Sequence, residues 1–267
     1  MKFDAEKSQI VESLQNAAAV AERRQTIPIL ANLRLKTLNG KLEVTATDLE
    51  IQIKTFSDLL DVEEEGETTV SARKMSELCR SLPDGEKVNF SLTSGKLTVR
   101  ANNFHADFAT ISPDDFPEIE INEELAPLKI NSSVLKRVLT KTAFSMASQD
   151  VRYYLNGMLL EVNGSKINGV ATDGHRLAFS SSSLVDSNLE VRNILPRKAV
   201  LELSKLLSAD DEDINLMIGP SYIEVKTDNL SFSSKLIDGK YPDYDKVFPT
   251  GNPLSLIHIS EPTRQSL

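Results

Sequence analysis

The chain has 267 residues, of which 40% are hydrophobic, and its 30 basic and 39 acidic side chains give a formal net charge of −9 at pH 7. This length and apolar content suffice for two ordinary cores, and no apolar run approaches the roughly 18 residues of a membrane span. The single cysteine, Cys79, excludes a disulfide framework and fits a small core residue. The start Met-Lys-Phe-Asp has no apolar signal core, so we expect a cytoplasmic protein.

The first half of the chain mixes helical and strand patterns. The spacing of Ile10, Leu14 and Ala17 predicts a helix over 6–24 that Pro28 ends. A second helix is predicted over 72–82, and the acidic run 63–67 is predicted to be a solvated loop. Period-two alternation predicts antiparallel strands at 42–46, 51–53, 88–92 and 97–101 and from Phe108 onward.

The second half shows the same mixture after an acidic, proline-bounded segment, 118–127, which predicts a linker. Helices are predicted over 132–146, with Ser132 or Ser133 as N-cap, and over 196–208, with Pro196 in the first turn. Strands are predicted at 155–162, 167–172, 177–181, 216–218, 223–225 and 232–236.

The second half repeats the first at an offset of 125 residues. A period of this size is that of a whole domain, so the sequence predicts two copies of one α+β fold, each with two helices packed on antiparallel sheets. The matches at 125 include Leu30 with Leu155, Leu35 with Leu160, Phe116 with Tyr241 and Glu77 with Glu202. Arg73 matches Arg197 at an offset of 124 instead of 125. The change of offset predicts that the second copy has one extra residue between Arg197 and Glu202.

The charge is distributed unevenly between these predicted elements. The four predicted helices hold twelve basic and five acidic side chains, a surplus of +7, so the rest of the chain carries −16. Basic helices on an acidic protein suit sequence-independent contact with phosphates on one face. The alternative is that these are ordinary solvated helix faces.

The run Ala-Thr-Asp-Gly-His-Arg-Leu at 171–177 stands out. Its Asp-Gly pair predicts a tight hairpin turn that presents His175 and Arg176 at the end of a sheet. A hydrolase built on Asp173 and His175 is a rival interpretation. It lacks a nucleophile in a recognisable elbow, and an Asp side chain in a turn more commonly binds the local backbone. We therefore predict no enzyme, and without a Gly-rich phosphate loop or a metal-ligand cluster, no cofactor.

Several long runs carry a resemblance to a known family. They are Gln-Asp-Val-Arg-Tyr-Tyr-Leu-Asn-Gly-Met-Leu at 149–159, Ala-Thr-Asp-Gly-His-Arg-Leu-Ala at 171–178, Pro-Arg-Lys at 196–198 and Ser-Lys-Leu-Ile-Asp-Gly-Lys-Tyr-Pro-Asp-Tyr at 234–244. The first half adds Thr-Ile-Pro-Ile-Leu at 26–30 and Thr-Asp-Leu-Glu at 47–50. Over residues 1–250 the chain resembles the beta subunits of bacterial DNA polymerase III, the sliding clamps.

The resemblance implies the DNA clamp fold and a non-catalytic processivity function. Family members have three similar domains, and two chains close head to tail around duplex DNA with the helices lining the hole. By this resemblance 1–125 is the first clamp domain and 126–250 the central one. Residues 251–267 do not continue the repeat, so we expect a non-native tail and no third domain, without which the family's ring cannot close. A nucleic-acid-binding scaffold without clamp function is the alternative, and it would bind linear and circular DNA alike.

The resemblance also implies two sets of site residues. One wall of a cleft for linear peptides, from the polymerase III catalytic subunit, the clamp loader and other polymerases or repair proteins, would comprise Leu155, Thr172, Gly174, His175, Arg176, Leu177, Pro242 and Val247. The positions near double-stranded DNA would be Arg24, Arg73, Gln149, Tyr153, Tyr154 and Lys198. Adjacent residues of a strand point to opposite faces, so we expect one of the two tyrosines to be packed. Taken without the resemblance, His175 is a turn residue.

Overall fold

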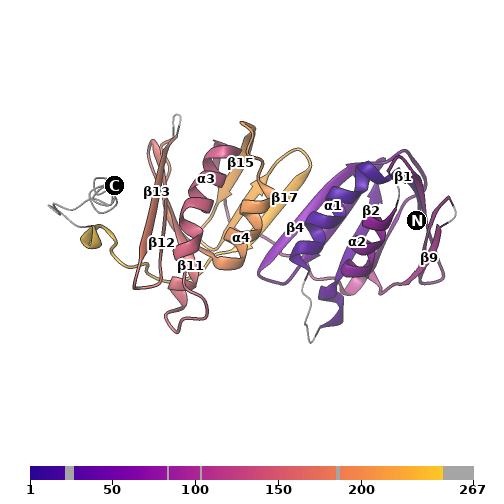
Figure 1. Cartoon of the computed structure of the whole chain (residues 1–267), viewed down its shortest axis with the longest axis horizontal. Helices are drawn as coiled ribbons and strands as arrows, with labels where there is room; N and C mark the ends of the chain where they lie inside the picture. Colours follow the sequence, from indigo (N-terminus) through magenta and orange to yellow (C-terminus); the bar gives the residue numbers. More distant parts are fainter. Residues whose placement is uncertain (22–26, 83, 103, 185–186, 249–267) are drawn as a thin grey trace, which may run out of the picture.

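The computed structural model describes residues 1–21, 27–82, 84–102, 104–184 and 187–248. Two units follow one another along the chain, and each places two α-helices on the same side of its sheets (Figure 1). Cys79 is buried in the core, as predicted. Within the described ranges no helix is both long and apolar enough to cross a membrane.

The first unit opens with a strand and a helix and continues mainly as strands. Its elements are β1 (Lys2–Glu6), α1 (Lys7–Val20), the 3-10 helix η1 (Pro28–Ala31), β2 (Asn32–Leu38), β3 (Lys41–Thr47), β4 (Ile51–Asp58), β5 (Asp61–Glu64), β6 (Gly66–Ser71), α2 (Ala72–Ser81), β7 (Lys87–Thr93), β8 (Lys96–Ala101), β9 (Phe104–Ala109) and η2 (Pro113–Asp115).

The second unit repeats this order. Its elements are β10 (Ala126–Asn131), α3 (Ser132–Thr142), η3 (Ala143–Ser145), η4 (Tyr153–Asn156), β11 (Gly157–Asn163), β12 (Lys166–Thr172), β13 (Leu177–Ser183), β14 (Glu190–Pro196), α4 (Arg197–Leu206), β15 (Asp213–Ile218), β16 (Tyr222–Lys226), β17 (Leu230–Lys235) and η5 (Asp245–Val247).

The predicted repeat is visible in the elements themselves. The pairs α1 and α3, η1 and η4, β2 and β11, β3 and β12, and α2 and α4 each begin 125 residues apart. Both α2 and α4 have ten residues, so Arg73 corresponds to Lys198 and not to Arg197. The predicted insertion before Glu77 is therefore wrong, because a helix of constant length cannot hold an extra residue.

One sheet runs through both units. Its eight strands have the order β10-β15-β16-β17-β4-β3-β2-β6, and the units meet where β17 pairs antiparallel with β4, with Phe232 opposite Ile53. The other sheets have the orders β5-β1-β7-β8-β9 and β13-β12-β11-β14. The outer edges of β9 and β13 pair with no further strand in the described part of the chain. The two units are thus joined by main-chain hydrogen bonds as well as by packing.

The helix ends differ from the predictions in three places. Helix α1 ends at Val20, and Pro28 begins η1 instead of ending the helix, while the predicted end at Arg24 lies outside the described residues. The N-cap of α3 is Asn131, whose Oδ1 accepts from the Ser133 amide at 3.0 Å. Pro196 ends β14 and serves as the N-cap residue of α4.

The acidic run 63–67 forms strand edges and not a loop. Glu63 and Glu64 belong to β5, and Glu63 accepts from the Lys2 ammonium at 2.5 Å. The strand β5 pairs with β1, so an edge position explains why charged side chains are tolerated there. The predicted loop is therefore wrong.

The predicted linker 118–127 lies against the sheet. Glu118 pairs with Lys54 at 2.6 Å, and the Ile119 amide donates to the Gln52 side chain at 2.9 Å. Glu123 accepts from the Ser221 amide at 3.0 Å, and β10 begins at Ala126. These contacts tie the connection to both units.

Candidate DNA-facing and peptide-binding surfaces

The four α-helices gather basic charge on one side of the molecule (Figure 1). Within their described residues they hold ten basic side chains against three acidic ones, a surplus of +7. Arg73, Arg137 and Lys141 are exposed. A surface of this kind attracts phosphates without reading a base sequence.

The predicted DNA-facing residues have different surroundings. The Arg73 side chain on α2 is 81% exposed and pairs with Glu77 at 2.8 Å. Lys198 on α4 pairs with Asp48 of the first unit at 2.5 Å and donates to the Val20 carbonyl at 3.4 Å. Gln149 is exposed, with a backbone φ of 59°. Arg24 lies outside the described residues.

Tyr153 and Tyr154 lie in η4 and not in a strand, so the predicted strand alternation does not apply to them. Tyr153 is 58% exposed, whereas Tyr154 packs against the cluster formed by Leu159, Val170 and Ile194. Their rings meet edge to face at 5.8 Å. One tyrosine is packed, as predicted, but the geometry of a 3-10 helix is the reason.

The predicted Asp-Gly turn connects β12 and β13. Thr172 pairs with Leu177 across the ladder, and Gly174 has a φ of +89°. Asp173 Oδ1 accepts from the amides of His175 and Arg176, each at 3.0 Å. These backbone bonds, together with the Arg176 guanidinium 3.0 Å from Oδ2, lower the pKa of Asp173. The carboxylate serves the turn, which argues against the hydrolase interpretation.

The equivalent turn of the first unit is built in the same way. Asp48 Oδ1 accepts from the Glu50 amide at 2.9 Å and from the Ile51 amide at 2.7 Å. Leu49 takes the place of Gly174 and has a φ of +75°. Each turn therefore has an aspartate that fixes the backbone around a left-handed residue.

Arg152, which the sequence did not single out as a site residue, supports the second turn. Its guanidinium forms a two-point ion pair with Asp150, with Nε 3.0 Å from Oδ1 and Nη2 2.8 Å from Oδ2. The side-chain bond to Arg152 lowers the pKa of Asp150 to about 2. A Cβ added to Gly174 would lie 3.1 Å from Arg152 Nη1, so the glycine also leaves room for this guanidinium.

The predicted cleft residues lie on and beside this turn, but they differ in what they expose. Gly174, His175, Arg176 and Pro242 are exposed, and Val247 is 63% exposed. Leu177 is half-buried, and the Thr172 amide donates to the Tyr241 hydroxyl at 3.0 Å. Leu155 is only 2% exposed and so offers little open apolar surface.

Exposed aromatic side chains that the sequence reasoning missed adjoin this surface. The Arg176 guanidinium lies 5.8 Å from the centre of the exposed Phe144 ring. Phe179 on β13 contacts Phe248 edge to face at 5.5 Å, and both are exposed. Phe179 follows buried Ala178 in the strand, so an aromatic residue at an outward position was the available signal.

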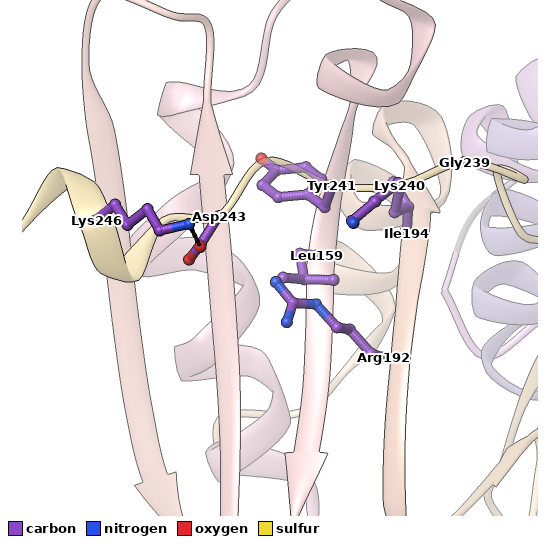
Figure 2. Close-up of a pocket in the computed structure, with 8 residues that line it drawn as sticks. All are labelled: Leu159, Arg192, Ile194, Gly239, Lys240, Tyr241, Asp243 and Lys246. Atoms are coloured by element: carbon purple, nitrogen blue, oxygen red, sulfur yellow. Dashed lines mark ion pairs between the residues drawn. The ribbon is translucent and has the colours of Figure 1, made fainter.

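A cavity of about 500 Å³ opens where the segment 239–246 crosses strands β11 and β14 (Figure 2). Leu159, Ile194 and Tyr241 line it with apolar surface, and Arg192, Lys240 and Lys246 bring positive charge. None of the eight predicted cleft residues lines this cavity. Its residues come from three separate stretches of the chain, so no local motif announced it.

Side chains able to bind a metal are not clustered in the described ranges, where no group of three or more His, Cys, Asp or Glu side chains could hold an ion. That part of the chain therefore contains no candidate metal site.

Comparison with known proteins identifies the family. The family model of the DNA polymerase III beta subunit N-terminal domain matches residues 1–120, and the family model of the beta subunit central domain matches residues 129–243. The beta sliding clamp of Pseudomonas aeruginosa is 42% identical over 252 residues, which are 94% of this chain and 69% of the relative. The beta sliding clamp of Vibrio cholerae is 40% identical, over 100% of this chain and 73% of the relative.

Solved structures agree with these matches. A Pseudomonas aeruginosa sliding clamp superposes with a TM-score of 0.91 at 41% identity, covering 95% of this chain and 69% of that one. The Caulobacter crescentus sliding clamp gives 0.88 at 31% identity, covering 94% and 70%. Both units and their arrangement are therefore those of solved clamps, and the chain belongs to the beta sliding clamp family, the beta subunits of DNA polymerase III.

Proposed function

We propose that the basic helical face of this sliding clamp lies along duplex DNA while the surface around the 172–177 turn holds partner peptides. The clamp domains would be 1–125 and 126–250. The partners would be the polymerase III catalytic subunit, the clamp loader and other polymerases or repair proteins. The function is tethering and not catalysis, it takes place in the cytoplasm, and in the full-length protein it requires two chains in a head-to-tail ring.

The observation that supports the DNA contact best is the surplus of +7 on the helices of a chain whose net charge is −9. Charge of one sign on one face attracts the phosphate backbone, while the acidic remainder disfavours binding elsewhere. Contacts of this kind are weak and independent of sequence. They suit a protein that must move along DNA without leaving it.

The DNA contact is tested by neutralising three exposed helix cations together, Arg73→Gln, Arg137→Gln and Lys141→Gln. Each lost phosphate contact should reduce the slope of log affinity against log salt by about 0.9, measured by fluorescence anisotropy with a labelled duplex. The matched control removes three cations from strands, Lys166→Gln, Lys226→Gln and Lys235→Gln. An equal change of slope in both triple variants would favour ordinary solvated helix faces over a DNA-facing surface.

A second DNA experiment separates a clamp from a scaffold that merely binds nucleic acid. After incubation with a clamp loader and ATP, the full-length protein should remain on a nicked circular plasmid and leave once the plasmid is linearised. Equal retention on both forms would favour the scaffold.

The peptide surface is tested with His175→Ala combined with Leu177→Ala, titrated against labelled peptides tiled across the polymerase III catalytic subunit. Burial of one apolar anchor contributes about 1.5 to 3 kcal/mol, so the tightest peptide should bind at least about tenfold more weakly. Leu38→Ala with His105→Ala, both exposed on the first unit, is the control. Unchanged affinity in the first variant would remove this surface from the proposal.

A further inference from the structure

A groove lies over the joint between the two units, on the face of the eight-stranded sheet that points away from the helices. The joint is the pairing of β17 with β4 (Figure 1). The Thr55 hydroxyl of β4 donates to the Ser13 carbonyl of α1 at 3.1 Å. Its neighbours Lys54 and Phe56 therefore point to the opposite face, which Ser231 of β17 shares because it lies opposite Lys54. Both units line the groove on this outer face.

The segment 118–125 crosses the outer face and forms one side of the groove. The Ile119 amide donates to the Gln52 side chain of β4 at 2.9 Å. Further along, Glu123 Oε1 accepts from the Tyr222 amide at the start of β16 at 2.9 Å. The segment is thus held to the first unit at one point and to the second unit at the other.

Four apolar side chains line the groove from three directions. Phe56 comes from β4, Leu230 from β17, and Ile119 and Ile121 from the crossing segment. All four are half-buried, so each keeps apolar surface that a ligand can cover. The volume of about 470 Å³ suits one or two side chains of a ligand.

The cations beside the groove already have partners. Lys54 pairs with Glu118 at 2.6 Å, and Lys226 pairs with Glu224 at 2.8 Å. These two pairs leave no net charge, so the sign of the groove depends on the remaining carboxylates.

Two carboxylates beside the groove form no ion pair with any residue that the structure describes. Glu43 of β3 lines the groove and is half-buried. Lys36 lies opposite Glu43 in the β2–β3 ladder, but the two do not form an ion pair. Glu120 is exposed and stands between the two lining isoleucines in the chain. The groove therefore offers an apolar surface with negative charge beside it.

We propose that this groove docks a basic peptide segment of a partner protein. The segment places one large apolar side chain on Phe56 and Ile121, and its neighbouring Lys or Arg side chains against Glu43 and Glu120. Charge complementarity selects this occupant, because the helices carry +7 on a chain of net charge −9 and the acidic excess lies outside them. The same excess disfavours a nucleic acid on this face.

A segment bound here contacts both units at once, since Glu43 and Phe56 belong to the first unit and Leu230 to the second. It would hold the joint in the arrangement that the structure shows.

The groove is separate from the peptide surface of the proposed function, and the inference does not rest on that surface. In the repeat, Lys54 and Ile119 correspond to Phe179 and Tyr244, whose rings lie 5.9 Å apart. The second unit thus has an aromatic pair where the groove has a lysine and an isoleucine. The two surfaces should therefore select different ligands.

The test uses methyl NMR of the chain with labelled Ile and Leu residues and the probe acetyl-Ala-Lys-Phe-Lys-Ala-amide. Millimolar probe should shift the methyl signals of Ile119 and Ile121. The same peptide with Gln in place of Lys should bind about fivefold more weakly, because two surface charge contacts are lost. Glu43→Lys and the exposed Glu120→Lys should each weaken the basic probe by a similar factor. Glu190→Lys, the same change at an exposed position on β14, is the matched control and should leave the affinity unchanged.

Three results would overturn the proposal. The first is an absence of shifts at Ile119 and Ile121. The second is equal binding of the Lys and Gln peptides, or equal weakening by Glu43→Lys and Glu190→Lys, which would show only a general attraction to an acidic protein. The third is loss of the shifts in His175→Ala with Leu177→Ala, which would assign the probe to the turn surface. That double variant tests the proposed function with its own peptides, so failure of one proposal is distinguishable from failure of the other.

Discussion

Lys198 on α4 of the second unit lies 2.5 Å from Asp48 in the β3–β4 turn of the first, and this ion pair joins the two units on the side of the helices. The Asp48 side chain is 6% exposed and that of Lys198 is 34% exposed. The same lysine was predicted to face DNA. Its contact with Asp48 gives it a structural role at the junction as well.

Asp48→Asn should therefore destabilise the junction. The amide oxygen can still accept from the Glu50 and Ile51 amides, so the turn persists while the charge that pairs with Lys198 is lost. We expect the free energy of unfolding to fall by about 1 to 2 kcal/mol in urea denaturation, because Asp48 is buried and Lys198 only partly so.

The repeat supplies the control for this variant. Asp173→Asn makes the same change in the equivalent turn, where the partner is the exposed Arg176 of the same turn. Surface pairs of that kind contribute about 0 to 1 kcal/mol, so Asp173→Asn should cost less than Asp48→Asn. Equal losses of unfolding free energy in the two variants would mean that the ion pair between Asp48 and Lys198 does not stabilise the junction.

Gly174→Ala should destabilise the second turn for two reasons. The residue has a φ of +89°, which costs a residue with a side chain about 1 to 2 kcal/mol, and its new Cβ would press on the Arg152 guanidinium. Gly40→Ala has a similar φ of +75° with nothing within 4 Å of the added Cβ, so it reports the backbone cost alone. The difference between the two variants in urea denaturation measures the contact with Arg152, and no difference would exclude that contact as a constraint.

Acid should weaken the fold partly through Asp150. The hydrogen bond from the Arg152 side chain lowers the pKa of Asp150 in the folded chain to about 2, from the ordinary 3.8 of an aspartate, so the folded state favours the ionised form. The resulting stabilisation is complete above pH 4 and is lost as the pH falls from about 4 towards 2. The free energy of unfolding of Asp150→Asn should therefore depend less on pH in that window. Asp228→Asn, at an exposed position between β16 and β17, is the control, and parallel pH profiles for both variants would contradict the prediction.

Cys79 should be unreactive in the folded protein. It is buried in the core, and burial raises the pKa of its thiol to about 12, so only about one thiol in ten thousand would be ionised at pH 8. Iodoacetamide should label the chain in urea but not in buffer, as followed by mass spectrometry. Rapid labelling in buffer would show that the helix α2 opens readily.

The repeat and most of the elements could be predicted because their causes are local. Amphipathic spacing predicted α2 within one residue, and the Asp-Gly pair predicted the turn between β12 and β13. The short strand β1 and the charged edge strand β5 were not predicted, because their own residue patterns do not favour a strand. Pairing with other strands stabilises them: β1 pairs with β7, and β5 pairs with β1.

The site residues show the same division. The exposure of His175 and Arg176 followed from the turn, which is local. The burial of Leu155, the ion pair of Lys198 with Asp48 and the cavity around Leu159 all depend on contacts between distant parts of the chain. Such contacts leave no signature in the spacing of one sequence.

The pairing of β17 with β4 has a further consequence for the ends of the molecule. In the repeat β9 is the counterpart of β17 and β13 is the counterpart of β4, and both have an outer edge that pairs with no further strand in the described part of the chain. Applied to these counterparts, the register that sets Leu230 opposite Thr55 would set Phe104 opposite Ser180. The free edges of β9 and β13 therefore correspond to the two strands, β17 and β4, that pair where the units meet. Growth by further units would need no new kind of bond, and whether the series closes depends only on the angle that each joint repeats.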